Sequence, residues 1–318
     1  MADPNAALGT TILSLVPSEK VLANRVDLIT REQNTLVTSG LAVQAGEEGA
    51  MLMKGGARKG SLSYINPLDA DEVNVSTDTD VDGKTGRITG AEYSCVRHDL
   101  NYGWKYFDLS RMITLYDAKG GIEAGIGEYW DKIGKKLGLA SINGALEAAE
   151  ADLVVGDGTA AFGRDLLIDA TATAEEFADD FDILITSAKN HAKLKKDRSN
   201  YAPGDTGIAL PTYGNMRVVV SNMFGEDTTV IAKRGALAFH VGTVPFEVPV
   251  EVERSASKGT GGGREILWSR RSFVVHPQGF GYVGGVGLKP EDMANGALWK
   301  LEIDPKFVGF RAIKHLAA

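Results

Sequence analysis

The segment KGGIEAGIGEYWDKIGKKLGLASINGAL, residues 119–146, organises this chain. Its apolar residues recur every three or four positions, which places one continuous apolar stripe on a helix. The opposite face is charged, and Glu128 and Asp131 each precede a lysine by four residues, the order that favours a helical ion pair. The sequence therefore predicts one helix of roughly 35–40 Å, long enough to span a domain. The apolar stripe consists of Ile122, Ile126, Trp130, Ile133 and Leu137.

Glycines at positions 125, 127, 134 and 138 weaken this helix locally. Each costs about 1 kcal/mol of helix stability relative to alanine. We therefore expect the helix to depend on tertiary contacts.

The composition is that of a chain with a substantial core and an acidic balance. The 318 residues are 43% hydrophobic and carry a net charge of −8, which argues against broad binding to a phosphate backbone. Cys95 is the one cysteine, so a disulfide could join it only to its copy in another subunit; this usage fits a cytosolic folding compartment. No apolar run approaches the roughly 18 residues of a membrane span. The N-terminus also lacks the basic and then apolar order of a signal peptide.

The N-terminal part predicts an arm rather than a core. Thr11–Val16 is a short apolar run, Glu19–Glu32 has the spacing of a helix, and the stretch from Gly40 to Gly60 is rich in small residues typical of a mobile segment. We expect this arm to lie against another surface.

Residues 58–105 predict a long β-hairpin. Ser61–Ile65 and Ile88–Leu100 alternate between apolar and polar residues, and an acidic stretch rich in Asp, Thr and Gly separates them. A two-stranded hairpin is marginal by itself, so we expect it to project from the body and to be ordered by a partner.

The remainder predicts an α+β arrangement without a regular βαβ alternation. We expect a turn at Asp157-Gly158-Thr159, with Asp157 as the N-cap candidate for a helix over Phe162–Phe177, and Ser187 as the cap of a helix over Ala188–Lys196. The expected strands and other segments are Asp182–Thr186, Met216–Val220, a strand pair over Thr228–Phe239 interrupted near Gly235, an edge strand over Val244–Val252, a glycine-rich loop over Ser255–Arg264, a strand over Ile266–His276, a short helix over Pro290–Leu298 and an extended segment over Trp299–Leu316.

One acidic motif invites a metal interpretation. Asp78, Asp80 and Asp82, followed by Gly83, match the first half of a calcium loop. The twelfth position is Thr89 instead of the glutamate that would complete the coordination. We expect an acidic, solvated tip, with cation binding by the three aspartates as the alternative.

No other motif in the sequence indicates a catalytic, cofactor-binding or metal-binding residue. The glycine run Lys258–Arg264 lacks the Lys-Ser/Thr pair of a phosphate loop and is read as a connection. The five histidines are far apart in sequence, and no Gly-x-Ser-x-Gly elbow occurs. A basic cluster is either a solvated helix face or a contact to nucleic acid or an acidic neighbour. This cluster is Lys193, Lys195, Lys196 and Arg198.

Six segments of the second half occur in an order and spacing similar to those of one protein family. They are residues 183–194, 211–221, 229–239, 250–254, 270–279 and 297–299. The series resembles the major capsid proteins of tailed bacteriophages, which have the Hong Kong 97 fold. Thr186-Ser187 is a departure, since many relatives have His-Ser there, and similarity is weak before residue 60.

The resemblance implies a place in that fold for each segment. Residues 1–57 would be the N-terminal arm lying across a neighbour, and 58–105 the extended loop. Residues 106–150 and 241–268 would form the peripheral domain with its spine helix. Residues 151–240 and 269–318 would form the axial domain and the C-terminal segment, with Phe273–Val275 rejoining the axial sheet.

The resemblance also implies a function. The chain would be a major capsid protein that self-assembles, without enzyme activity or cofactor, into the icosahedral head shell enclosing the phage genome. Identical subunits would form hexamers and pentamers, with portal, scaffolding and decoration proteins as further partners and no membrane. An acidic shell would enclose double-stranded DNA without sequence-specific binding. The chain would be found in the virion, after assembly in the host bacterial cytoplasm.

Three alternatives stay open on the sequence alone. In the same fold, the chain could be the shell of an encapsulin-like compartment around a cargo enzyme. An enzyme with an unrecognised hydrolytic site and a calcium-stabilised adhesin are the other two classes.

Overall fold

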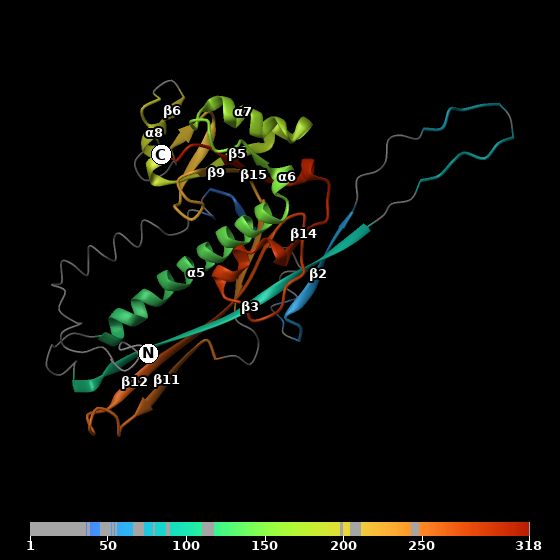
Figure 1. Ribbon diagram of the computed structural model, residues 1–318. Coiled ribbons are helices and arrows are strands. Elements are labelled where there is room, and N and C mark those ends of the chain that lie inside the picture. Colours follow the sequence, from blue (N-terminus) through green and yellow to red (C-terminus); the bar gives the residue numbers. More distant parts are fainter. Residues whose placement is uncertain are drawn as a thin grey trace.

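The computed structural model shows an elongated body from which one hairpin projects (Figure 1). It describes residues 36, 39–44, 52, 54, 56–65, 73–78, 80–86, 90–109, 118–197, 200–203, 211–242 and 248–317. The predicted run Thr11–Val16 and helix Glu19–Glu32 lie outside these residues.

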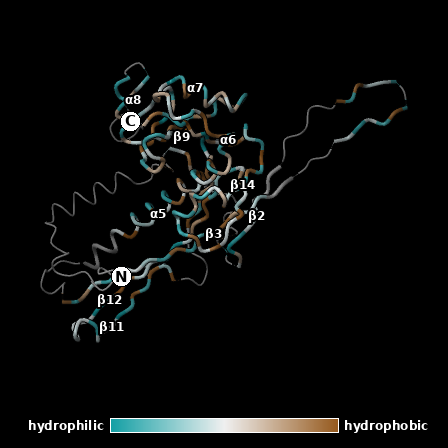
Figure 2. Tube along the Cα trace, viewed as in Figure 1, coloured by the Kyte–Doolittle hydropathy of each residue, from teal (hydrophilic) through white to brown (hydrophobic). Residues whose placement is uncertain are grey.

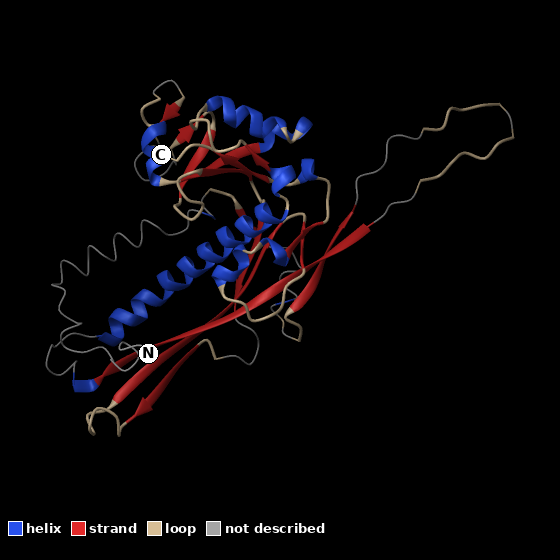
Figure 3. Ribbon diagram, viewed as in Figure 1, coloured by secondary structure: helices blue, strands red, loops and turns tan. Residues whose placement is uncertain are grey.

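The described elements alternate irregularly between strands and helices, as expected for an α+β chain (Figure 3). The β-strands are β1 (Ala42–Gln44), β2 (Lys59–Ile65), β3 (Gly90–Phe107), β4 (Val154–Val155), β5 (Phe181–Thr186), β6 (Tyr201–Ala202), β7 (Thr212–Tyr213), β8 (Met216–Val220), β9 (Thr228–Lys233), β10 (Leu237–Gly242), β11 (Val250–Ser255), β12 (Arg264–Pro277), β13 (Phe280–Tyr282), β14 (Trp299–Leu301) and β15 (Phe310–Lys314). The helices are α5 (Ala118–Ala148), α6 (Glu150–Leu153), α7 (Arg164–Ala172) and α8 (Ala188–Leu194), with 3-10 helices η2 (Glu175–Asp180), η3 (Pro290–Ala294), η4 (Gly296–Leu298) and η5 (Pro305–Phe307).

A six-stranded sheet forms the long axis of the body. Its order is β1-β10-β12-β3-β2. Strand β11 also pairs with β12, along a different part of that strand than β10 does. The first half of β3 pairs with β2 and its second half pairs with β12, both antiparallel. This second partner extends β3 to Phe107, beyond the predicted end at Leu100.

The second large sheet has seven strands in the order β4-β15-β9-β5-β8-β7-β6. The apolar run Ile183-Leu184-Ile185 lies on its central strand β5, which is parallel to β8 and antiparallel to β9. Leu184 faces α7 and α8, while Ile183 and Ile185 face the core that includes the end of α5. Helices or core cover both faces, which explains why β5 is apolar without alternation.

Helix α5 confirms the predicted rod and spans about 46 Å. Trp130 and Leu137 of the stripe are buried, and the polar face is at least partly exposed up to Lys136. Beyond Lys136 the helix is buried on nearly every side. Its last turns pack against both sheets and against the segment from η3 to β14. Hydrophobic residues gather in this part of the body (Figure 2).

Two strand expectations need correction. The predicted pair over Thr228–Phe239 consists of two strands, but β9 and β10 lie in different sheets and do not pair with each other. Gly235, at a φ of 72°, lies in the turn between them. Phe273–Val275 of β12 does not rejoin the seven-stranded sheet; these residues pair with β10, and Phe273 and Val274 also pair with β3.

The described part of the predicted arm packs on its own subunit. Strand β1 runs parallel to β10, and Leu36, Leu41 and Ala42 are buried in the main core. The mobile stretch expected from Gly40 to Gly60 therefore contains ordered residues, since apolar side chains in it reach the core. Leu52 is also buried, beneath the root of the hairpin.

Two helix caps differ in outcome. Ser187 caps α8 as predicted, because its hydroxyl accepts a hydrogen bond from the Asn190 N–H at 3.2 Å. Asp157 closes the predicted turn by accepting a hydrogen bond from the Thr159 N–H at 3.0 Å, but it does not cap the helix. Helix α7 begins only after Gly163, which offers no side-chain cap.

Candidate assembly surfaces

The hairpin projects far beyond the body and ends in an exposed tip (Figure 1). Asn74 holds the two sides of this tip together: its side chain donates to the Lys84 carbonyl oxygen at 2.6 Å and accepts from the Lys84 N–H at 3.0 Å. Val73, Val75 and Val81 are 85%, 82% and 75% exposed there. Three exposed valines on one projecting tip are costly in water and are suited to contact with another surface.

Sequence reasoning missed these valines because it took the tip as acidic throughout. The signal was present as the alternation Val73-Asn74-Val75 within a run of carboxylates and hydroxyls. Asp78, Asp80 and Asp82 of the same tip are exposed. Among the described residues no group of three His, Cys, Asp or Glu side chains is arranged to hold a metal ion.

Asp99 fixes the root of the hairpin to the body. Its carboxylate accepts from the Arg97 Nε at 2.7 Å and from the Ser272 hydroxyl of β12 at 2.8 Å, and it lies 2.9 Å from the Arg58 Nε. Arg97 also donates to the Leu52 carbonyl oxygen at 2.5 Å. Burial raises the pKa of Asp99, but hydrogen bonds from Arg97 and Ser272 and the charges of Arg97 and Arg58 outweigh it and hold the pKa below its usual value.

Strand β11 lies at an edge of the six-stranded sheet and pairs with β12 alone among the described strands. Val248, Val250 and Val252, which the predicted edge strand included, are about half exposed. Glu251 and Glu253 alternate with them, and they pair with Arg270 at 2.9 Å and with Arg264 at 3.6 Å. This edge therefore presents one apolar side and one charged side.

The glycine-rich loop connects β11 to β12 and is followed by a strand, as predicted, so it has no helix N-terminus to hold a phosphate. Backbone hydrogen bonds from the Gly263 N–H to the Lys258 carbonyl oxygen at 3.0 Å, and from Gly262 to Gly259 at 3.1 Å, close it as a turn.

The histidines are distributed over separate parts of the structure. His98 and His276 are buried, and desolvation lowers the pKa of each from 6.5 to about 4. The His276 Nε2–H donates to the Phe280 carbonyl oxygen of β13 at 2.6 Å, and the His276 ring stacks on Tyr93 with 5.1 Å between ring centroids. His315 lies 2.9 Å from the Thr229 hydroxyl in the seven-stranded sheet. Each therefore packs within the core, and they do not form one cluster.

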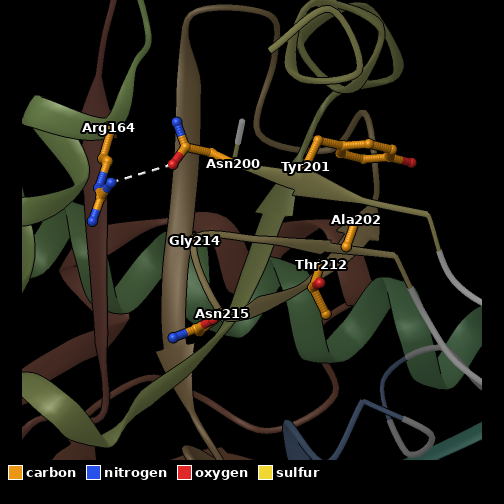
Figure 4. A pocket seen from close by; sticks show the side chains of 7 residues that line it. All are labelled: Arg164, Asn200, Tyr201, Ala202, Thr212, Gly214 and Asn215. Carbon is orange, nitrogen blue, oxygen red and sulfur yellow. Dashed lines mark hydrogen bonds between the residues drawn. The ribbon is translucent and has the colours of Figure 1, made fainter. Parts of the chain in front are cut away.

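One hollow of about 310 Å³ lies between the start of α7 and strands β6 and β7 (Figure 4). Arg164 faces Asn200 across it, with its Nη1 donating to the Asn200 Oδ1 at 3.3 Å. Its other lining residues are Tyr201, Ala202, Thr212, Gly214 and Asn215. This lining offers one cation and neutral polar groups, without a paired nucleophile and base.

Cys95 lies fully buried between Leu52 and Val274, and its thiol is 3.6 Å from the Gly60 carbonyl oxygen. In this conformation the sulfur is not accessible to its copy in another subunit. None of the helices in the described segments has the combined length and apolar character needed to cross a bilayer.

Comparison with known proteins gives these surfaces a context. No family model matches the sequence. The major capsid protein of Bacillus phage SPP1 is 28% identical over 315 residues, covering 90% of this chain and 92% of that protein. The solved capsid of Ralstonia phage GP4 matches with a TM-score of 0.55 at 10% identity over 87% of each chain. A chain of Mycobacterium phage Patience matches with a TM-score of 0.52 at 10% identity, over 98% of this chain and 91% of that one.

The solved structures show that the chain has the mixed α and β fold of phage capsid subunits. The chain is a homologue of a phage major capsid protein, which confirms the resemblance drawn from its sequence.

Proposed function

We propose that this chain is the major capsid protein of a tailed bacteriophage and self-assembles into the icosahedral head shell that encloses the genome. The observation that carries this proposal is the relationship to a phage major capsid protein over nine-tenths of both chains. The projecting hairpin supports the proposal, because the exposed valines at its tip are unfavourable in water and suit contact with another subunit. An encapsulin-like compartment is not favoured, since the matched relatives belong to phages.

The domain division belongs to the same proposal. Residues 58–105 act as the extended loop, 106–150 and 241–268 as the peripheral domain with α5 as spine helix, and 151–240 and 269–318 as the axial domain and C-terminal segment. The separate seven-stranded sheet supports an axial domain. Within the last range, β12 up to Pro277 belongs to the six-stranded sheet and η3, η4 and β14 pack on α5, whereas β15 lies in the seven-stranded sheet.

The partners are copies of the same chain, arranged in hexamers and pentamers. A portal and a scaffolding protein complete the assembly, and the shell contains double-stranded DNA without reading its sequence. The net charge of −8 supports containment without tight binding. The chain performs no reaction, needs no cofactor, and resides in the virion after assembly in the host cytoplasm.

Deletion of residues 70–89 tests the proposal, because it removes the tip and leaves β2 and β3 whole. The shortened subunit is expected to stay soluble and folded while forming no closed shells. Normal shells in electron micrographs of this variant would contradict the role of the hairpin.

A further inference from the structure

The basic cluster of the sequence forms an exposed surface at the end of α8. Lys193, Lys195 and Lys196, the α8 lysine surface, are all exposed, and within the described residues none of them has an ion-pair partner. Lys189 of the same helix differs, since its Nζ lies 2.7 Å from a Glu226 carboxylate oxygen. Arg198, the fourth residue of the predicted cluster, lies outside the described residues. Three neighbouring cations without a counter-charge repel one another and favour an acidic partner.

A complementary acidic surface lies on η2 of the same domain. Glu175, Glu176, Asp179 and Asp180, the η2 acidic surface, are all exposed. Among these four, within the described part of the chain, only Glu175 has an ion pair, with Lys306 at 3.7 Å. The η2 acidic surface therefore carries more negative charge than its own subunit neutralises.

The two surfaces lie on different sides of the domain. Helix α7 begins beside α8: His315 lies 3.5 Å from Asn190 of α8, and its ring contacts Phe162, just before α7, at 5.0 Å between centroids. From there α7 runs away from α8 for about 13 Å before η2 begins (Figure 1). The Lys306–Glu175 pair joins η2 to η5. Within the described residues, no ion pair joins the α8 lysine surface to the η2 acidic surface of the same subunit.

We propose that the α8 lysine surface of one subunit contacts the η2 acidic surface of the next copy in a ring. This inference rests on the proposed function and names the contact that sets the order of subunits within a hexamer or pentamer. Opposite charges on two sides of one domain make a head-to-tail contact, and head-to-tail contacts generate rings when the rotation closes. Each exposed pair contributes little by itself, but the contact recurs around the ring and through the shell.

The contact is tested by charge reversal and by exchange of the two charges. Variant one is Lys193→Glu, Lys195→Glu and Lys196→Glu; variant two is Glu176→Lys, Asp179→Lys and Asp180→Lys. Each alone is expected to lower the yield of shells by about tenfold or more, because like charges then face each other. A chain carrying all six substitutions is expected to recover shells, since the pairs re-form with reversed sign. Lys289→Glu reverses an exposed lysine just before η3, away from both surfaces, and is the control expected to assemble normally.

The outcomes separate this contact from other roles. Shells at normal yield from variant one, or no recovery in the six-fold variant while its isolated subunits keep the wild-type unfolding transition, would overturn the inference. Variant-one shells that form normally but retain less DNA would overturn it too, by assigning the lysines to the polymer. If the unmodified chain forms no shells, the proposed function itself fails, whatever the variants do.

Discussion

Gly144 of α5 lies directly against the indole of Trp299. A Cβ atom at Gly144 would come 2.3 Å from the Met293 carbonyl oxygen and 2.6 Å from the Trp299 Nε1. That Nε1 donates to the same Met293 oxygen at 3.0 Å, so the helix packs against a fixed hydrogen bond. The glycine is therefore needed for the close approach of the segment from η3 to β14.

Gly144→Ala should destabilise the subunit even though alanine is the better helix former. Overpacking in a tight core costs about 1–3 kcal/mol, more than the gain of up to about 1 kcal/mol in helix propensity. Gly127→Ala is the control, because no atom lies within 4 Å of a Cβ built there; it should be neutral or stabilising. Urea unfolding of dissociated subunits measures both, and equal midpoints would show that the packing at Gly144 is looser than described.

Asp99→Asn should loosen the root of the hairpin. The Arg97 guanidinium, only 7% exposed, would lose its carboxylate, and breaking such a pair costs about 3–5 kcal/mol. Glu251→Gln removes an exposed ion pair with Arg270 and should cost less than about 1 kcal/mol. Because the folded pKa of Asp99 is lowered, its contribution is present above the unfolded pKa and is lost as the pH falls. Comparable losses in the two variants, measured by urea unfolding, would argue against a locked root.

His276→Phe should reduce the loss of stability in acid. The unfolded histidine binds a proton near pH 6.5, while burial lowers the folded pKa to about 4, so stability falls as the pH drops between these values. The full effect is on the order of 3 kcal/mol per histidine. The free energy of unfolding is measured at pH 7 and pH 4.5; its difference should shrink in the variant, and further when His98→Leu is added. An unchanged difference would mean that His276 is not buried as neutral imidazole.

Replacing the three tip valines, Val73, Val75 and Val81, by asparagine should separate folding from assembly. These side chains are exposed in the single subunit, so its unfolding free energy should change by less than about 0.5 kcal/mol. The yield of shells should fall, because the apolar contacts with another surface are lost. The control is Val286→Asn, because Val286 is also exposed but lies on the body. Unchanged shell yield from the triple variant would show that the tip valines make no contact in the shell.

Much of the fold could be predicted because local patterns agree with it. The stripe through Trp130 and Leu137 predicted α5, the apolar run Ile183–Ile185 predicted β5, and Ser187 predicted the start of α8. In these segments periodicity and capping chemistry act over a few residues, so the sequence carries the information directly.

Strand partners and close packing could not be predicted in the same way. The sequence near Gly235 indicates a turn, but not that the strands before and after it enter different sheets. Gly134 and Gly138 looked like weak points of the helix, although they give Phe239 and Leu237 room to approach it. Arg311 is a buried guanidinium whose donors meet the Thr173 hydroxyl and three carbonyl oxygens. The close approaches at the two glycines, and the contact of Arg311 with Thr173, join residues far apart in the chain, and no local pattern encodes them.

The assembly surfaces were predictable only in outline. The hairpin followed from two alternating runs, but the exposed valines of its tip were hidden among acidic neighbours. The lysines of α8 were visible as a cluster, whereas their lack of an ion-pair partner within the described residues required the fold.

Electron microscopy of the purified chain at high concentration, with its mass measured in solution, tests the central claim most directly. We predict closed, hollow shells built from many copies, in which the hairpin of each subunit lies on a neighbour. A compact monomer that stays single at every concentration, with the hairpin folded back on its own body, would contradict the account.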